Sequence, residues 1–456
     1  FVVNGSLVSG GDVQGFRFSD DGAFIAYVAD ERVDEEDELF VVDLGPVPTG
    51  SPGRPIVANG PLVTFGDVGG GFFSDGEFQW APGTHKVLYV ADELTASQDE
   101  LFIFDADNPQ LGSQRVNQGL FSSTAADVDT DSWRLSPDGQ WVAYVADVVS
   151  TSATDAFLVD ISGTSPGTPV VLNDLARAGD VGTTSGDLGF SPNGQWVHYI
   201  ASEGDPGDRL YLKDLTNLSA TSQLASFDVG STTQDVDNAV WSPDGRRVAF
   251  RGNVRDSGFD ELFFADTQLV GSPVRLNPTL VSGGNVNTIS SDDFDWSPDG
   301  AFLVYLADQD VDNSIEPYLV SVDDPESATR LSGTGLGDDT SSVRFASDAE
   351  AILYVGEETG TSGSSLVYVD FNPSTGAVSP KVVINNPTGT TDDVSSSDIR
   401  FIDSSAGVLY ISAQNQGGSD EEALFRTLGT MVGTSFRLNP PLPTSGDVFE
   451  VFVQEE

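Results

Sequence analysis

Apolar residues along this chain alternate as they do in β-strands, and the same arrangement returns about every 55 residues. Each copy has a short strand that ends in Ser-Pro-Asp-Gly or a degraded form of it, then a Tyr-centred apolar strand, an acidic loop and a third strand. In the third copy, Pro137-Asp138-Gly139 predicts a turn, because proline sets a negative φ and glycine accepts a positive one. Trp141–Ala146 follows as a β-branched and aromatic strand.

Each of the eight copies predicts four strands. In the third copy they cover 132–135, 141–146, 156–160 and 169–173, and no stretch of the chain has convincing helical spacing. A fixed period of this size indicates units that bury their apolar faces against their neighbours. Four short antiparallel strands, repeated radially, hide nearly all sheet edges. The sequence therefore predicts an all-β fold, an eight-bladed β-propeller of four-stranded antiparallel blades, as one domain over residues 1–456.

One aromatic residue recurs at the same place in every second strand. Large aromatic side chains at such positions are typical of packing between sheets rather than of a binding stripe. We expect the following residues to lie in the core: Tyr27, Tyr89, Tyr144, Tyr199, Phe250, Tyr305, Tyr354 and Tyr410.

The Ser-Pro-Asp-Gly phrase followed by an apolar strand resembles the TolB-like and WD-like propeller repeats of bacteria. Residues 275–286 and 305–310 resemble a longer subtype, in which an acidic hairpin precedes Glu-Leu-Phe or Glu-Leu-Tyr. The resemblance covers nearly the whole chain and implies the propeller fold. It implies function only broadly, since TolB-like propellers serve as docking platforms, as lids beside hydrolase domains and as surface modules.

The composition is strongly acidic, with 71 acidic and 20 basic residues and a formal charge of −51. This charge excludes nucleic acid as a natural partner and disfavours contact with anionic membranes. It also destabilises a compact state unless salt or bound cations screen it. The chain has no cysteine and no apolar run of membrane length. From these features and the start at Phe1, we expect a processed extracellular or cell-surface protein, with the periplasm as the alternative.

An acidic loop between a second and a third strand is the first candidate site. Alternate aspartates place hard oxygens on one side of a turn, and Ca²⁺ binds six to eight such oxygens. The loop departs from the EF-hand pattern, because Asn313 stands where glycine is expected and Leu319 where the closing glutamate would be. A solvated hairpin that protects a sheet edge is the alternative. The predicted calcium ligands are Asp308, Asp310, Asp312 and Glu316.

A second acid precedes each first strand and is usually followed by valine. These carboxylates could form an ion-binding ring at one mouth of a channel. Capping of turns through backbone N–H groups is the favoured interpretation, as in Asx-turns. The positions are Asp12, Asp67, Asp127, Asp180, Asp235, Asn285, Asp339, Asp393 and Asp447.

Catalytic arrangements are poor. Ser165 lies in a Gly-x-Ser-x-Gly match, but a nucleophile elbow needs a strand-to-helix turn and this match falls between strands. His85 and His198 are the only histidines, and neither has a motif partner for general base work or metal binding. We therefore expect that the chain is not an enzyme. A propeller hydrolase or lyase is the third alternative for its function.

Counting strands leaves one surplus strand at each end. Residues 1–3 are of the fourth-strand type and residues 448–453 of the first-strand type, whereas eight blades need neither. Unpaired strands invite association, and pairing with a neighbouring copy would build an open filament. Alternatively, these strands add to the protein's own blades or mark where a longer polypeptide was cut. The residues expected to mediate assembly are Phe1, Val2, Val3, Val448, Phe449, Val451, Phe452 and Val453.

These interpretations together predict a secreted or cell-surface scaffold, not an enzyme, that assembles with copies of itself into a filament or surface layer and uses calcium as a stabilising ion. The alternative is a monomeric, calcium-stabilised propeller that docks another surface protein or a glycan. Neither alternative includes insertion into a membrane.

Overall fold

A computed structural model gives the structure of the protein. It describes residues 3–33, 36–45, 53–63, 66–69, 78–117, 127–150, 153–174, 180–183, 186–203, 207–227, 235–253, 258–286, 294–332, 340–346, 350–357, 364–383, 400–402, 407–412, 423–428 and 435–437. The chain divides into two compact units, Phe1–Trp241 and Ser242–Glu456.

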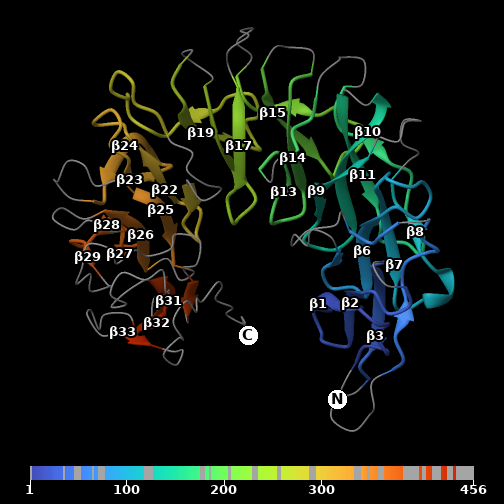
Figure 1. Ribbon diagram of the computed structural model, residues 1–456. Helices are drawn as coiled ribbons and strands as arrows, with labels where there is room; N and C mark the ends of the chain where they lie inside the picture. The colour runs from blue at the N-terminus through green and yellow to red at the C-terminus, as the bar shows by residue number, and fades with distance from the viewer. Residues whose placement is uncertain are drawn as a thin grey trace. The chain divides into compact units, whose positions relative to one another are not determined.

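Four complete sheets and one further strand belong to the first unit (Figure 1). The first sheet contains β1 (Val13–Phe18), β2 (Phe24–Ala29), β3 (Glu38–Asp43) and β4 (Ile56–Val57). The second contains β5 (Phe78–Trp80), β6 (Lys86–Ala91), β7 (Glu100–Asp105) and β8 (Gln114–Arg115). The third contains β9 (Val128–Leu135), β10 (Trp141–Ser150), β11 (Ala153–Asp160) and β12 (Val170–Val171), and the fourth β13 (Leu188–Phe190), β14 (Trp196–Ala201), β15 (Arg209–Asp214) and β16 (Gln223–Leu224). The further strand is β17 (Val236–Trp241).

The second unit continues the same series. The fifth sheet joins β17 to β18 (Arg247–Gly252), β19 (Glu261–Asp266) and β20 (Val274–Arg275). The sixth contains β21 (Phe294–Trp296), β22 (Phe302–Ala307), β23 (Glu316–Ser321) and β24 (Asp324–Arg330). The seventh contains β25 (Thr340–Phe345), β26 (Ala351–Glu357), β27 (Ser364–Asn372), β28 (Ala377–Val378) and β29 (Val382–Val383). The eighth contains β30 (Arg400–Ile402), β31 (Gly407–Ser412), β32 (Ala423–Leu428) and β33 (Ser435–Arg437).

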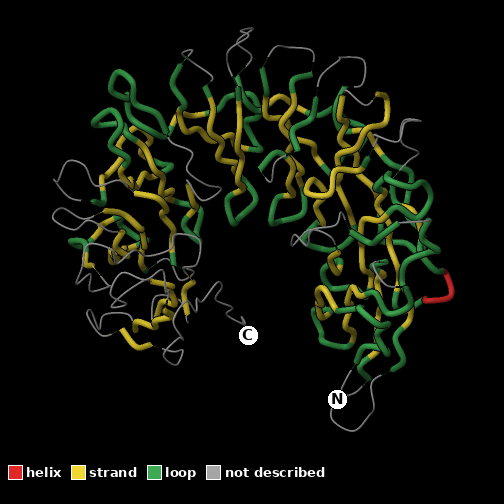
Figure 2. The backbone as a smooth tube through the Cα atoms, in the orientation of Figure 1, coloured by secondary structure: helices red, strands yellow, loops and turns green. Residues whose placement is uncertain are grey.

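Every sheet is antiparallel, with strands that are consecutive in sequence lying side by side. The described residues form eight such sheets, and their one helical segment is the 3₁₀ turn η1 (Pro109–Leu111), drawn red in Figure 2. The predicted fold class, an all-β eight-bladed propeller of four-stranded antiparallel blades, is confirmed. No helix in these ranges is long and apolar enough to cross a membrane.

Two sheets differ from the predicted pattern. In the third, β10 and β11 continue to the pair Ser150↔Ala153, beyond the expected strand ends at 146 and 156. The added residues include Val148 and Val149, which are β-branched and favour strand geometry. In the seventh, β29 pairs with β27 as a fifth strand.

Neighbouring sheets pack through two distinct faces, which we call leading and trailing. The leading face of a sheet turns toward the preceding sheet, and the trailing face turns toward the following one. In the first sheet, Ala26, Val28, Leu39 and Val41 form the trailing face. They share one core with the leading face of the second sheet, which includes Phe78, Trp80, Tyr89 and Phe102. The same division recurs between the second and third sheets, the third and fourth, and the sixth and seventh.

The recurring aromatic position lies in these cores, as predicted. Tyr89 and its equivalents are almost fully buried, and each stacks on an aromatic residue of the third strand. The ring centroids of Tyr89 and Phe102 are 5.8 Å apart, and those of Tyr144 and Phe157 are 5.2 Å apart. Tyr410 lies in β31, a strand for which only the backbone is described.

Candidate functional site

The acids that precede the first strands act as caps between sheets. Asp67 Oδ1 accepts the backbone N–H of Asp37, at the end of the preceding acidic loop, at 3.0 Å. Asp127 accepts from Asp99 and Asp235 accepts from Asp208, each at 3.0 Å. This arrangement is the predicted capping role, with one difference: each cap holds the loop of the preceding sheet rather than its own turn.

A second recurring contact was missed in the sequence. The Tyr89 hydroxyl donates to Glu93, four residues later, at 2.7 Å, and Glu93 also accepts the backbone N–H of Gly60 at 2.8 Å. The pairs Tyr27–Glu31 and Tyr199–Glu203 repeat the first contact at 2.6 and 2.9 Å. Each tyrosine–glutamate pair therefore holds the connection that arrives from the preceding sheet. The available signal was the four-residue spacing of tyrosine and glutamate.

Crowding of these carboxylates raises their pKa values. Burial, then the neighbouring charges of Asp67, Asp30 and Asp12, raise the pKa of Asp37 to about 6. Burial and the charges of Asp127 and Asp92 raise the pKa of Asp99 to about 6 as well. A raised folded-state pKa of a carboxyl stabilises the fold fully below the ordinary value of 3.8, and this contribution is lost as pH rises through 6.

The residues predicted to bind calcium have other contacts. Asp308 is buried and accepts two backbone N–H groups, from Asn285 and, at 2.9 Å, from Asn313. Asp310 interacts with the Tyr318 hydroxyl, whose pKa is raised by burial first and then by this carboxylate. The Asp312 carboxylate lies against Gly283, where an added Cβ would come within 2.8 Å of it.

Glu316 belongs to a structural series. It accepts a hydrogen bond from Ser332, and its Oε1 lies 4.0 Å from Arg330 Nη1. The equivalent pairs in other sheets are Glu100–Arg115 at 2.9 Å and Glu261–Arg275 at 2.7 Å. Among the described residues, no group of three or more acidic or histidine side chains is placed to hold a metal ion. The structure thus does not gather Asp308, Asp310, Asp312 and Glu316 into one cage, and calcium binding here stays a prediction.

Of the residues predicted to mediate assembly, Val3 is described. It packs against Ile25, Tyr27 and Phe40 on the leading face of the first sheet, so it covers its own chain. The other predicted assembly residues lie outside the described ranges: Phe1, Val2, Val448, Phe449, Val451, Phe452 and Val453.

An apolar patch lies on β1, next to the surface that Val3 covers. We call Val13, Phe16 and Phe18 the β1 patch. They pair with Ala29, Tyr27 and Ile25 of β2, so the register places them on the leading face. They are 40%, 62% and 54% exposed, and the two phenyl rings meet edge to face at 6.0 Å.

The same positions are buried wherever a described sheet precedes them. Val68, Phe78 and Trp80 are the equivalents in the second sheet and are 1%, 5% and 7% exposed. The Trp80 indole N–H also donates to the Arg17 carbonyl of the first sheet at 3.1 Å. The β1 patch is therefore half of an inter-sheet contact, and it was missed because its sequence reads like every other first strand.

The histidines and Ser165 lie apart. Ser165 is exposed in the β11–β12 connection, where the Lys86 ammonium donates to the carbonyls of Ile161 and Gly163 at 2.6 and 2.7 Å. His198 is buried in β14 and its Nε2–H donates to the Gly186 carbonyl at 3.2 Å. This placement between strands agrees with the prediction for Ser165.

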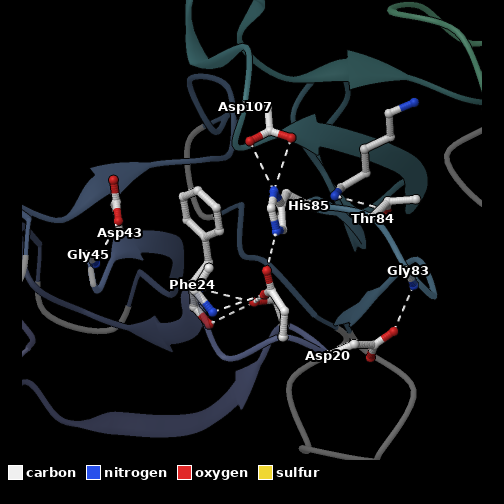
Figure 3. Close-up of polar contacts among 12 residues, drawn as sticks. Asp20, Phe24, Asp43, Gly45, Gly83, Thr84, His85 and Asp107 are labelled. Carbon is white, nitrogen blue, oxygen red and sulfur yellow. Dashed lines mark hydrogen bonds and ion pairs between the residues drawn. The ribbon is translucent and has the colours of Figure 1, made fainter. Parts of the chain in front are cut away.

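His85 joins the turns of the first two sheets. Its Nε2 lies 3.1 Å from Asp21 Oδ2, and its Nδ1 lies 3.0 Å from both oxygens of Asp107 (Figure 3). Asp20 accepts the backbone N–H of Gly83 beside it at 2.7 Å. Burial opposes the charged form, but hydrogen bonds with Asp107 and Asp21 outweigh it and raise the pKa of His85.

We expect His85→Ala to lower the melting temperature more at acidic than at alkaline pH. A raised histidine pKa stabilises the fold fully below the ordinary value of 6.5, and the contribution is lost as pH rises through the raised value. Thermal melts of both proteins on either side of that value would measure the difference. Asp107→Asn is the matched control that keeps the ring but weakens one partner. An equal loss at both pH values would contradict the expectation.

Comparisons with known proteins add little to this geometry. No family model matches the chain, and no curated protein matches it. Among solved structures, the chain is similar to a prolyl endopeptidase at 15% identity and a TM-score of 0.40, over 89% of this chain. The chain spans 55% of the length of that structure. The prediction that the chain is not an enzyme is corrected by this finding, because the matched protein is a peptidase. At this TM-score the similarity carries no argument about which activity, if any, this chain has.

Proposed function

We propose that the protein is a secreted or cell-surface β-propeller scaffold that associates with copies of itself through the ends of its repeat series. One observation carries the proposal: the β1 patch is exposed, whereas its equivalents in the second sheet are buried. Burying one phenylalanine side chain contributes about 1.5–3 kcal/mol, so Phe16 and Phe18 together favour a covered state. The surplus end segments, 1–3 and 448–453, support association at the same ends of the series.

Charge sets the conditions for this association. Two copies that each carry a formal charge of −51 repel one another over long distances at low ionic strength. Salt near 1 M shortens the screening length to about 3 Å, and the apolar contact then decides the equilibrium. We therefore expect association to strengthen as salt is added, which is the opposite of an interface held by ion pairs.

The test is the molar mass of the purified chain by light scattering over a range of salt concentrations. We expect the mass to exceed that of one chain, 48.1 kDa, and to rise with salt and protein concentration. Phe16→Asp combined with Phe18→Asp should weaken association ~30-fold or more, as loss of a central aromatic contact does. Leu269→Asp is the matched control, since Leu269 is 67% exposed in the β19–β20 connection. A single-chain mass at all salt concentrations would contradict the proposal.

A further inference from the structure

We propose that the β1 patch of one copy docks on the trailing face of the last sheet, β30–β33, of a second copy. This inference rests on the proposed function and specifies its partner surface. It treats the contact between copies as one more inter-sheet core, built with the geometry already present between the first and second sheets.

The established contact defines what the patch requires. Phe78 and Trp80 enter a core with Ala26, Val28, Leu39 and Val41, which alternate along β2 and β3. The partner is therefore a flat pair of antiparallel strands that presents small and medium apolar residues. It also presents a backbone carbonyl, since the Trp80 indole N–H donates to that of Arg17.

The last sheet places matching residues in matching register. Leu409 pairs with Arg426 and Ile411 with Leu424, as Ala26 pairs with Val41 and Val28 with Leu39. Three of the four positions of this face are thus leucine or isoleucine. The fourth, Arg426, has a precedent on a trailing face.

That precedent is Arg251, which follows the stacked ring Phe250 as Val28 follows Tyr27. Arg251 is 4% exposed, and its guanidinium donates to the Val286 carbonyl at 3.4 Å. A trailing face of this repeat therefore accepts an arginine where most sheets have an aliphatic residue.

The two faces differ and lie at opposite ends of the series of sheets. Docking of one on the other is heterologous, and each added copy presents a new β1 patch. A contact of this kind builds an open, head-to-tail chain unless its rotation happens to close. Because the interface is an apolar core, salt should strengthen it as the proposed function requires.

Cysteine cross-linking tests the pairing directly, because the natural sequence has no cysteine. The turns of the first and second sheets meet where Asp21 lies 3.1 Å from His85. Ala23 directly precedes β2 as His85 precedes β6, and Ser404 follows Phe401 by three residues as Asp21 follows Phe18. Proteins carrying Ala23→Cys alone and Ser404→Cys alone are mixed at high salt and treated with a short bismaleimide.

We expect a covalent dimer that contains one chain of each kind. Replacing Ser404→Cys by Ser219→Cys, on the exposed β15–β16 connection, should reduce the yield ~10-fold, and so should Phe16→Asp with Phe18→Asp in the Ala23→Cys protein. Cross-linking only within one chain of a protein that carries both cysteines would overturn the inference. So would the absence of mixed dimer when light scattering shows oligomers, and that outcome leaves the proposed function standing. A single-chain mass in light scattering instead removes both.

Discussion

Phe78→Ala should lower the free energy of unfolding by about 3–5 kcal/mol, whereas Phe16→Ala should change it by less than about 0.5 kcal/mol in the monomer. The two residues have the same type and the same repeat position, opposite Tyr89 and Tyr27. Phe78 is 5% exposed in the core between the first and second sheets, and its loss leaves a cavity. Phe16 is 62% exposed, so its truncation leaves none.

Urea unfolding of the two variants at low salt, where the chain is expected to be a monomer, would measure both values. Under conditions that favour association, Phe16→Ala should instead become destabilising, because the wild-type ring is then covered. Equal losses for the two variants in the monomer would contradict the description of the β1 patch as an open half-contact.

His198 should make stability fall by about 3 kcal/mol as pH drops from 6.5 to about 4. Burial, with a smaller effect of the Arg134 charge, lowers the pKa of His198 from 6.5 to about 4. A depressed histidine pKa means that the neutral ring stabilises the fold fully above the ordinary value, and this contribution is lost as pH falls through the folded-state value. A shift of about 2.5 pKa units at about 1.4 kcal/mol each gives the stated size.

The structure explains why charging this ring is costly. Its Nδ1 is buried without a hydrogen-bond partner among the described residues, and the ring centroid lies 5.8 Å from that of Trp241. A proton on Nδ1 would therefore be placed in an apolar core with no acceptor.

The matched variant is His198→Leu, because Leu88 and Leu353 hold the equivalent position in other sheets. The quantity to measure is the difference in unfolding free energy between wild type and variant at several pH values. This difference cancels Asp37 and Asp99, whose raised pKa values act in the opposite direction. A difference that does not change with pH would refute the assignment.

Most of the fold could be predicted from the sequence because the signal repeats. Each Ser-Pro-Asp-Gly turn is a local feature: Ser136 Oγ donates to Asp138 at 2.6 Å and accepts the N–H of Trp141 at 2.9 Å. Such contacts lie within five residues, so composition and spacing reveal them. The position of Tyr144 between sheets follows from the alternation of its strand in the same way.

The candidate site could not be predicted, because it depends on contacts between repeats. Phe16 and Phe78 have the same residue type and the same neighbours in sequence terms, and only the packing of a preceding sheet distinguishes them. The calcium prediction treated Asp308 and Asp312 as neighbours on one turn. In the folded chain Asp308 is occupied by backbone N–H groups, one of them from a residue 23 positions earlier.

The contact of Glu93 with Tyr89 and Gly60 has a consequence for how such a chain can change its length. Every unit contains the acceptor that secures the segment arriving from its predecessor, together with the segment that its successor will secure. A unit duplicated in tandem would therefore fit between its parents without any new surface. Gene duplication and loss could vary the number of units while each junction kept the same chemistry.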